Sequence, residues 1–149
     1  GVKIELRGEA MEVVGIDFSK ADVSRHLNCR ESGSTLRFLI PTAMASGQTA
    51  VFYGEGGLMA RPMNVYEELF KSKGLTYISD GESIVVKGPI SGGEYSLPGN
   101  VSSQFISGLL FALPVCDGDS EIFLEGKIES LSYIDMTLAA MKMCQIDII

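Results

Sequence analysis

Apolar and polar residues alternate in four short segments of the chain, residues 3–6, 11–14, 76–79 and 83–87. A short polar stretch with a central glycine, Gly8 or Gly81, separates the two members of each pair. Alternation with a period of two is typical of strands, and two such segments around a glycine turn are typical of a β-hairpin. The pattern therefore predicts one hairpin near the start of the chain and another near its middle.

Two longer stretches, residues 34–45 and 103–113, are mostly apolar, and Arg37 is the one charged residue within them. A helix that is apolar on nearly all sides is a buried helix. Each stretch is followed by a short apolar segment, residues 49–53 or 120–124, which predicts a strand. Apolar residues at helical spacing then predict an amphipathic helix over residues 63–71 and another over residues 133–143.

The same order of elements occurs twice. Residues 46–52 resemble 117–123, and residues 1–15 resemble 74–88. One copy covers residues 1–73 and the other 74–144, while residues 145–149 resemble 74–78 and predict the first strand of a third copy. The unit reads β-β-α-β-α as cut here, or βαβαββ in another register, which is an α+β fold. We expect residues 1–149 to be one partial domain of a longer protein, and the alternative is a complete two-repeat domain.

Composition excludes several classes of protein. The formal net charge of −7 argues against a nucleic-acid partner, which would require a basic face. No apolar run is long enough to predict a membrane span. The three cysteines have no metal-ligand spacing, and the single histidine, His26, has no partner that suggests a metal site. Three unpaired thiols favour a cytoplasmic protein.

Each buried helix begins with polar residues that offer hydrogen-bond donors. Ser32, Gly33 and Ser34 stand at the start of the first helix, and Ser102, Ser103 and Gln104 at the start of the second. A helix N-terminus has about four unpaired N–H groups and a partial positive charge, so such a start can bind an anion. The simpler interpretation is an N-cap, which accounts for one serine at each start. The residues alone leave both interpretations open.

Arginine and tyrosine residues occupy similar positions in the loops before the amphipathic helices. Arg61 and Pro62 are expected to open the first of these helices, where a cation opposes the helix dipole and is better explained by a ligand. Ser130 and Tyr133 occupy the corresponding loop of the other copy. For Arg37, inside the buried helix, we favour a structural role, in which it pairs with a buried carboxylate or carbonyl, over contact with a ligand.

Four segments resemble the motifs of the EPSP synthase family, whose members are 3-phosphoshikimate 1-carboxyvinyltransferases. They are residues 29–37 (CRESGSTLR), 61–63 (RPM), 97–105 (LPGNVSSQF) and 129–137 (ESLSYIDMT). The related UDP-N-acetylglucosamine enolpyruvyl transferases share the repeat architecture and are the alternative, although the Ser-Ser-Gln block is not expected in them. The resemblance implies two globular domains of three βαβαββ units around buried parallel helices, and this chain looks like a truncated part of the first.

The resemblance also implies a reaction and roles for individual residues. Family members transfer the enolpyruvyl group of phosphoenolpyruvate to the 5-hydroxyl of shikimate 3-phosphate, with release of phosphate and without a metal or organic cofactor. The residues that resemble contacts of shikimate 3-phosphate are Ser102, Ser103, Gln104, Ser130 and Tyr133. Those that resemble contacts of phosphoenolpyruvate are Gly33, Ser34, Arg61 and Gln104.

The chain also departs from the family pattern. Arg30 and Glu31 replace a Gly-Asn pair, so a carboxylate stands near the phosphoenolpyruvate motif, and Leu131 and Ser132 replace Lys-Pro. The general acid and base of the family are expected outside these 149 residues, so we expect no catalysis by this chain alone. A non-catalytic module for phosphate ligands and a structural domain without ligand are the alternatives. Missing repeat units also predict self-association through the truncated face.

Overall fold

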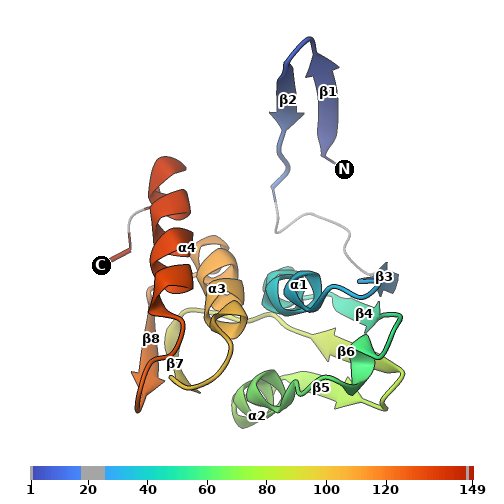
Figure 1. Cartoon of the computed structure of the whole chain (residues 1–149), viewed down its shortest axis with the longest axis vertical. Coiled ribbons are helices and arrows are strands. Elements are labelled where there is room, and N and C mark those ends of the chain that lie inside the picture. The colour runs from blue at the N-terminus through green and yellow to red at the C-terminus, as the bar shows by residue number, and fades with distance from the viewer. Residues whose placement is uncertain (1, 18–25, 147) are drawn as a thin grey trace.

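Residues 2–17, 26–146 and 148–149 are described by the computed structural model (Figure 1). This part of the chain contains eight strands, four α-helices and two short 3₁₀ helices. In chain order they are β1 (Lys3–Arg7), β2 (Ala10–Val14), β3 (His26–Asn28), α1 (Gly33–Ala45), β4 (Thr49–Tyr53), η2 (Leu58–Ala60), α2 (Asn64–Ser72), β5 (Thr76–Ser79), β6 (Ser83–Lys87), β7 (Gly93–Pro98), α3 (Ser103–Ala112), η3 (Leu113–Val115), β8 (Ser120–Glu125) and α4 (Leu131–Met143). Both predicted hairpins and all four predicted helices are present, which confirms the α+β class.

Four strands form the larger sheet, in the order β3-β4-β6-β5. β3 and β4 are parallel, whereas β6 is antiparallel to both β4 and β5. The series β3-α1-β4-α2-β5-β6 is therefore one complete βαβαββ unit, which is the second of the two registers allowed by the repeat. The sheet joins strands from both sides of residue 73. The limits 1–73 and 74–144 therefore mark the period of the sequence repeat and not the boundaries of the folded units.

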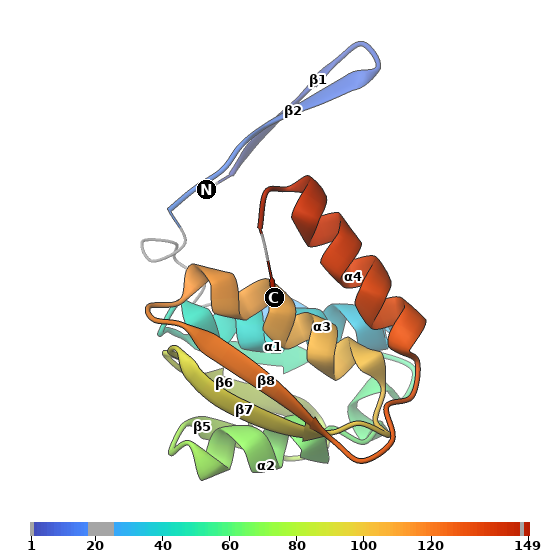
Figure 2. The same ribbon diagram turned by 90° about the vertical axis from the view of Figure 1, so that its left-hand side faces the viewer.

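The second unit has a smaller sheet, formed by the parallel pair β7 and β8 (Figure 2). β7 lies in a part of the chain where the sequence pattern predicted no strand. Tyr95 and Leu97 are buried while Glu94 and Ser96 are exposed, as expected for a strand with one covered face. The glycine at its start and the proline at its end concealed this alternation.

The β1–β2 hairpin stands apart from the rest of the molecule in both views (Figures 1 and 2). Ile4 pairs with Val13, and Leu6 with Met11, so these four apolar side chains share one face. All of them are exposed to solvent. The opposite face is polar, and there Arg7 forms ion pairs of 3.1 Å with Glu5 and 2.8 Å with Glu12.

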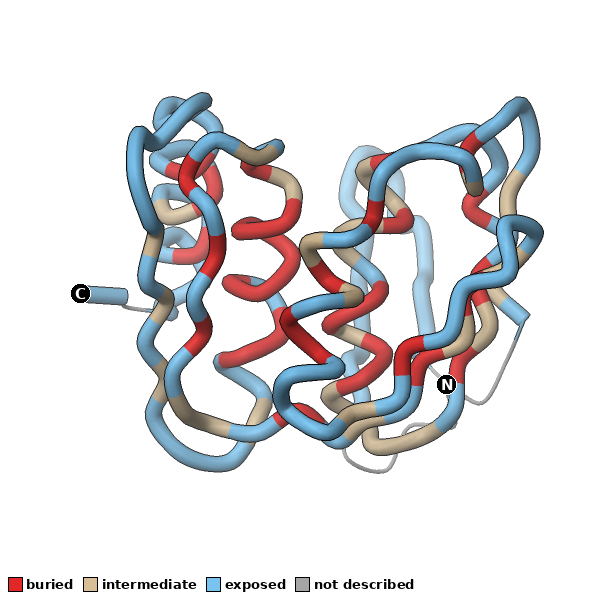
Figure 3. Tube along the Cα trace, turned by 90° about the horizontal axis from the view of Figure 1, so that it is seen from below, coloured by how far each residue is buried: buried red, intermediate tan, exposed pale blue. Residues whose placement is uncertain are grey.

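The core lies around α1 and α3, which pack against each other and carry many of the buried positions (Figure 3). The two helices are parallel, because the starts of both meet at Ser34 and Gln104, and Phe38 of α1 reaches Phe111 of α3 further along. The predicted buried helices are thus confirmed. α4 covers the other side of α3, where the hydroxyls of Ser107 and Thr137 are 2.8 Å apart.

The alignment of residues 46–52 with 117–123 was wrong by a single position in β8. Ala50 and Phe52 face the core from β4, and the residues of β8 that pack inward are Ile122 and Leu124. Phe123, which the alignment placed on Phe52, is 45% exposed. A slip of one position moves every side chain of a strand to its other face, so burial reveals what similarity of sequence did not.

The strand predicted for residues 145–149 is not formed by the residues described there, which are 145, 146, 148 and 149. A strand needs a hydrogen-bonded neighbour, and this segment has none among the described residues. The proposed third copy stays a prediction. In the part of the chain that is described, no helix is both long enough and apolar enough to cross a membrane.

Candidate anion-binding site

The start of α1 consists of a serine N-cap, Ser32, followed by a glycine, Gly33. The hydroxyl of Ser32 accepts hydrogen bonds from the backbone N–H of Thr35 at 3.1 Å and from its hydroxyl at 2.8 Å. Ser32 is therefore an ordinary N-cap, as the simpler interpretation proposed. Gly33 is buried, and no acidic residue stands in the first turn. The positive end of this helix dipole is left without a carboxylate from its own turn.

The start of α3 is built in the same way. Ser102 accepts a long hydrogen bond of 3.4 Å from the N–H of Gln104, and again the first turn contains no acidic residue. Ser103 follows as the first residue of the helix and is only 7% exposed. Ser32 and Ser102 thus serve as the caps, and the caps leave the hydroxyls of Ser34 and Ser103 for other contacts.

Gln104 connects the two helix starts. Its amide nitrogen donates to the hydroxyl of Ser34 at 2.7 Å, and its amide oxygen accepts from Nη1 of Arg37 at 2.8 Å. Because an arginine can only donate, this contact fixes which end of the amide faces Arg37. The side chain of Gln104 is therefore held between α1 and α3 in one orientation.

Two guanidinium groups lie against Gly33. A Cβ atom at this position would be 2.8 Å from Nη1 of Arg61 and 3.0 Å from Nη1 of Arg37, so the glycine permits their approach. Burial lowers the pKa of Arg37, and the positive charge of Arg61 lowers it further. Among the described residues neither arginine forms an ion pair, and the buried Nε of Arg37 has no hydrogen-bond partner. This arrangement suits an anion, which would supply the missing negative charge.

Tyr66 of α2 and Gly108 of α3 hold the helix pair together below these groups. The Tyr66 hydroxyl is 2.9 Å from the carbonyl oxygen of Arg37 and 2.7 Å from that of Phe105. A Cβ at position 108 would collide with this hydroxyl and with the Arg37 carbonyl. Arg37 also lies over the Phe105 ring, with its guanidinium carbon 4.9 Å from the ring centre.

The hydroxyl residues surround a cavity of about 400 Å³ between α1, α3 and α4. Its lining includes Ser34, Ser102, Ser103, Gln104, Ser130 and Tyr133. Ser130 is in the left-handed region, with φ at 58°, and makes no side-chain cap to α4. The structure therefore brings together all the residues predicted for shikimate 3-phosphate. Gly33 directly precedes Ser34 of this lining, and Arg61 lies against Gly33.

Two features of the site differ from expectation. Arg61 and Pro62 do not open α2, which begins at Asn64; Arg61 instead ends the 3₁₀ helix η2. Arg37 does meet the oxygen of an amide, but it also lies beside Arg61 in the site, which the sequence analysis did not assign to it. The sequence signal for this role of Arg37 was that it is the single charged residue within an apolar helix. The side chain of Glu31 lies against Gly56, in the loop before η2.

Parallel helices that present hydroxyls, an amide and one arginine at one end, with a second arginine from η2 beside them, define a repeat protein with a site suited to anionic small molecules. The model of the EPSP synthase (3-phosphoshikimate 1-carboxyvinyltransferase) family matches residues 1–149. The chain therefore belongs to the EPSP synthase family.

Relatives with this activity in their names agree with that assignment. The chain is 40% identical over 155 residues to the 3-phosphoshikimate 1-carboxyvinyltransferase of Clostridium botulinum, matching 100% of this chain and 36% of the relative. It is 43% identical over 132 residues to that of Brachyspira hyodysenteriae, matching 87% and 31%. The chain thus spans about a third of the length of these relatives.

A solved structure supports the fold. The EPSP synthase from Acinetobacter baumannii superposes with a TM-score of 0.64 at 23% identity, over 89% of this chain and 32% of that one. At this level of identity the likeness concerns the fold alone. It agrees with the tandem βαβαββ architecture described above.

Proposed function

We propose that the chain is part of the first domain of an enzyme that transfers the enolpyruvyl group of phosphoenolpyruvate to the 5-hydroxyl of shikimate 3-phosphate and releases phosphate. Its own contribution is the shikimate 3-phosphate half-site and part of the phosphoenolpyruvate site. The observation that carries this proposal is the cavity at the joined starts of α1 and α3, with its hydroxyl lining and the two arginines beside it.

The shikimate 3-phosphate is held at the starts of α3 and α4. Its phosphate takes hydrogen bonds from Ser102, Ser103 and Ser130, whose hydroxyls are donors to anionic oxygens. Tyr133 is 59% exposed at the mouth of the cavity, where its ring can cover the face of the shikimate ring. Neither α3 nor α4 has a carboxylate in its first turn that would repel the phosphate.

Phosphoenolpyruvate is held beside Gly33. Arg61 and the backbone of Gly33 contact its charged groups, with Ser34 adjacent. Gln104 lies between the two ligands, since its amide already reaches Ser34 on one side and its helix start borders the cavity on the other. Arg37 acts as a positioning residue, because it orients the Gln104 amide and adds positive charge.

The transfer reaction requires an acid and a base, which the lining of the cavity does not contain. Its lining consists of serine, threonine, glutamine, methionine and aromatic residues, without a carboxylate or an imidazole. Proton transfer to and from the reactants needs such a group within hydrogen-bond reach. We therefore assign the general acid and base to other parts of the enzyme and expect this chain to bind without turnover. Its three free cysteines favour a cytoplasmic location.

Calorimetric titration with shikimate 3-phosphate tests the half-site. Ser103→Ala and Ser130→Ala should each weaken binding about ten- to a hundredfold, because one hydrogen bond to a charged group is worth about 1.5–3 kcal/mol. Ser132→Ala is the matched control, since Ser132 follows Ser130 closely in α4 and does not line the cavity. Unchanged affinity in both variants, with circular dichroism showing intact folding, would disprove the assignment.

A non-catalytic module for phosphate ligands is the second candidate, favoured by the same absence of a carboxylate or imidazole from the cavity lining. Both candidates predict binding, so the distinction is whether this chain contributes to turnover. Phosphate release should be undetectable with this chain alone and should appear when a polypeptide with the remaining two thirds of a family member is added. If the mixture releases no phosphate while this chain still binds shikimate 3-phosphate, the result favours the module.

A further inference from the structure

Pro41 lies inside α1, four residues after Arg37, and is buried. In an α-helix each carbonyl accepts a hydrogen bond from the N–H four residues further on. A proline has no N–H, and its ring crowds the carbonyl four residues before it. The carbonyl of Arg37 therefore lacks its ordinary helical donor. A Cβ at Gly108 would meet both this carbonyl and Cγ of Pro41, so α3 packs directly against this point of α1.

The hydroxyl of Tyr66 supplies a donor from α2. It lies within hydrogen-bond distance of the carbonyls of Arg37 and Phe105, and it carries one proton. The carbonyl of Phe105 has a helical donor in the N–H of Leu109, four residues further on in α3. The Arg37 carbonyl is therefore the one that depends on the tyrosine. Tyr66 is completely buried, and burial raises its pKa well above the ordinary value, so the hydroxyl keeps its proton.

The two carbonyls that meet Tyr66 belong to the backbone of the anion site. The side chain of Arg37 donates to the amide oxygen of Gln104, and Phe105 directly follows Gln104 in α3. The ring of Tyr66 also packs edge-on against that of Phe105, with their centres 4.8 Å apart. The tyrosine thus holds the backbone on both sides of the contact between Arg37 and Gln104.

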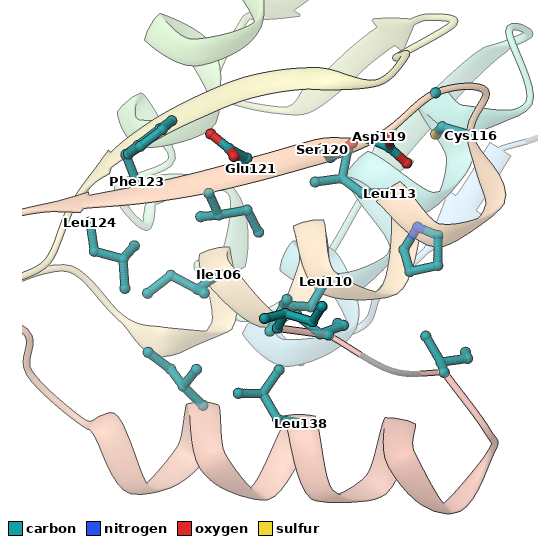
Figure 4. A pocket seen from close by; sticks show the side chains of 17 residues that line it. Ile106, Leu110, Leu113, Cys116, Asp119, Ser120, Glu121, Phe123, Leu124 and Leu138 are labelled. Atoms are coloured by element: carbon teal, nitrogen blue, oxygen red, sulfur yellow. The ribbon is translucent and has the colours of Figure 1, made fainter.

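The opposite face of α3 does not fix this register. Ile106 and Leu110 of α3 line a groove of about 880 Å³, together with Leu124 of β8 and Leu138 of α4 (Figure 4). Contacts between apolar side chains are non-directional. The directional contacts that set α3 against α1 are therefore those of Tyr66 and Gln104.

We propose that Tyr66 is a positioning residue for the anion site: its hydroxyl holds the Arg37 carbonyl that Pro41 leaves without a helical donor, and so keeps Arg37 within reach of Gln104. Tyr66 belongs to α2 and does not line the cavity, so it acts through these two residues. The proposal rests on the proposed function, because it gives Tyr66 an effect on the affinity for shikimate 3-phosphate.

Tyr66→Phe removes the hydroxyl and keeps the ring. Tyr95→Phe is the matched control, because Tyr95 is also buried and its hydroxyl donates to a carbonyl, that of Ser91, while neither residue lines the cavity. In calorimetric titration with shikimate 3-phosphate, Tyr66→Phe should weaken binding at least about fivefold, since it disturbs a hydrogen-bonded arginine of the site. Tyr95→Phe should leave the affinity unchanged. Equal affinities in the parent chain and Tyr66→Phe would overturn the proposal.

A double-mutant cycle without ligand tests the effect on Arg37 directly. Gln104→Ala removes the partner of Arg37 and should raise the equilibrium constant for unfolding in urea. This rise should be at least about threefold smaller in the Tyr66→Phe background than in the parent, because contacts in one network are not additive. It should be unchanged in the Tyr95→Phe background. Equal rises in all three backgrounds would contradict a role for Tyr66 in positioning Arg37.

The cycle also separates this proposal from the proposed function. A parent chain that does not bind shikimate 3-phosphate would refute the half-site, and the unfolding data would still decide whether Tyr66 positions Arg37.

Pro41→Ala tests which carbonyl depends on the tyrosine. It gives the Arg37 carbonyl a helical N–H, so Tyr66→Phe should raise the equilibrium constant for unfolding at least about threefold less in this background than in the parent. If Tyr66→Phe alone does not fold, circular dichroism should show that the double variant does. A cost of Tyr66→Phe that Pro41→Ala leaves unchanged, or a double variant that stays unfolded, would overturn the proposal.

Discussion

The two copies of the repeat differ in what lies beside their second strand. In the first unit β6 pairs with β4, and Phe52 is completely buried. In the second unit β8 has no such neighbour among the described residues, and Leu124, the inward-facing counterpart of Phe52, is only partly buried. α1 and α3 are nevertheless both buried in the core, because each packs against the other. The comparison shows that burial of the helix pair does not depend on the hairpin, whereas burial of the second strand does.

Deleting an aromatic side chain from each second strand should give the largest difference. Phe52→Ala removes a fully buried ring and should lower the free energy of unfolding by about 3–5 kcal/mol. Phe123→Ala should cost less than about 1 kcal/mol, because surface substitutions have small effects. Urea unfolding measures both. Similar losses in the two variants would contradict the inward orientation of Phe52 and the outward orientation of Phe123.

Gly108→Ala tests the shared helix contact. The added Cβ collides with the Tyr66 hydroxyl and the Arg37 carbonyl, so α1 and α3 must separate, and we expect a loss of about 1–3 kcal/mol. Gly15→Ala is the control, since no atom lies within 4 Å of the added methyl group. Thermal unfolding compares the two. A Gly108→Ala chain as stable as the parent would show that the helices adjust without cost.

Substitution of Gln104 separates stability from anion binding. Gln104→Ala leaves Nη1 of Arg37 and the hydroxyl of Ser34 without their partner and should cost about 1–3 kcal/mol of stability. Gln104→Glu places a carboxylate against Arg37, so we expect stability to be retained while affinity for phosphoenolpyruvate falls. Unfolding curves and calorimetric titration measure the two effects. Retained affinity in the glutamate variant would exclude a ligand next to this side chain.

Tyr77 lies in the β5–β6 hairpin of the complete unit. Tyr77→Phe should have the smallest effect on stability at neutral pH. The buried Tyr77 hydroxyl has no hydrogen-bond partner, so its removal should change stability by less than about 1 kcal/mol, with either no loss or a gain. Chemical unfolding at pH 7 tests this. A loss of about 2 kcal/mol or more, the cost of leaving a buried partner unsatisfied, would indicate that the hydroxyl is hydrogen-bonded in solution.

The alkaline behaviour of the same variant follows from the direction of the pKa shift. Burial, and then the charge of Glu67, raise the pKa of Tyr77 above its ordinary value. The unfolded chain therefore loses this proton first, and the associated stability is complete below about pH 10 and lost as pH rises above it. Tyr77→Phe should lose stability less steeply than the parent above about pH 10. Parallel pH profiles would contradict this.

The pattern of apolar residues predicted most of the elements, for identifiable reasons. The limits of β4, β5 and β6 agree with the prediction, because their alternating residues face a core on one side only. β3 was missed, since a strand as short as His26–Asn28 is too brief to define a period. The inward face of β8 was misassigned because similarity of sequence cannot detect a slip of one position.

The sequence predicted which residues form the site better than it predicted the contacts between them. The motifs identified Ser102, Ser103, Ser130 and Tyr133, and the structure places them around one cavity. The role of Arg37 depends on a long-range contact with Gln104, and such a contact requires the helices to be parallel and in register. Neither condition can be inferred from local composition.

The amide of Gln104 has one oxygen and one nitrogen, and both are occupied by α1. A ligand that takes Arg37 or Ser34 for itself releases one end of this amide and changes what the neighbouring ligand meets. By thermodynamic linkage, each of two ligands then alters the affinity of the other by the same factor. If two small anions bind as proposed, this single side chain couples their affinities.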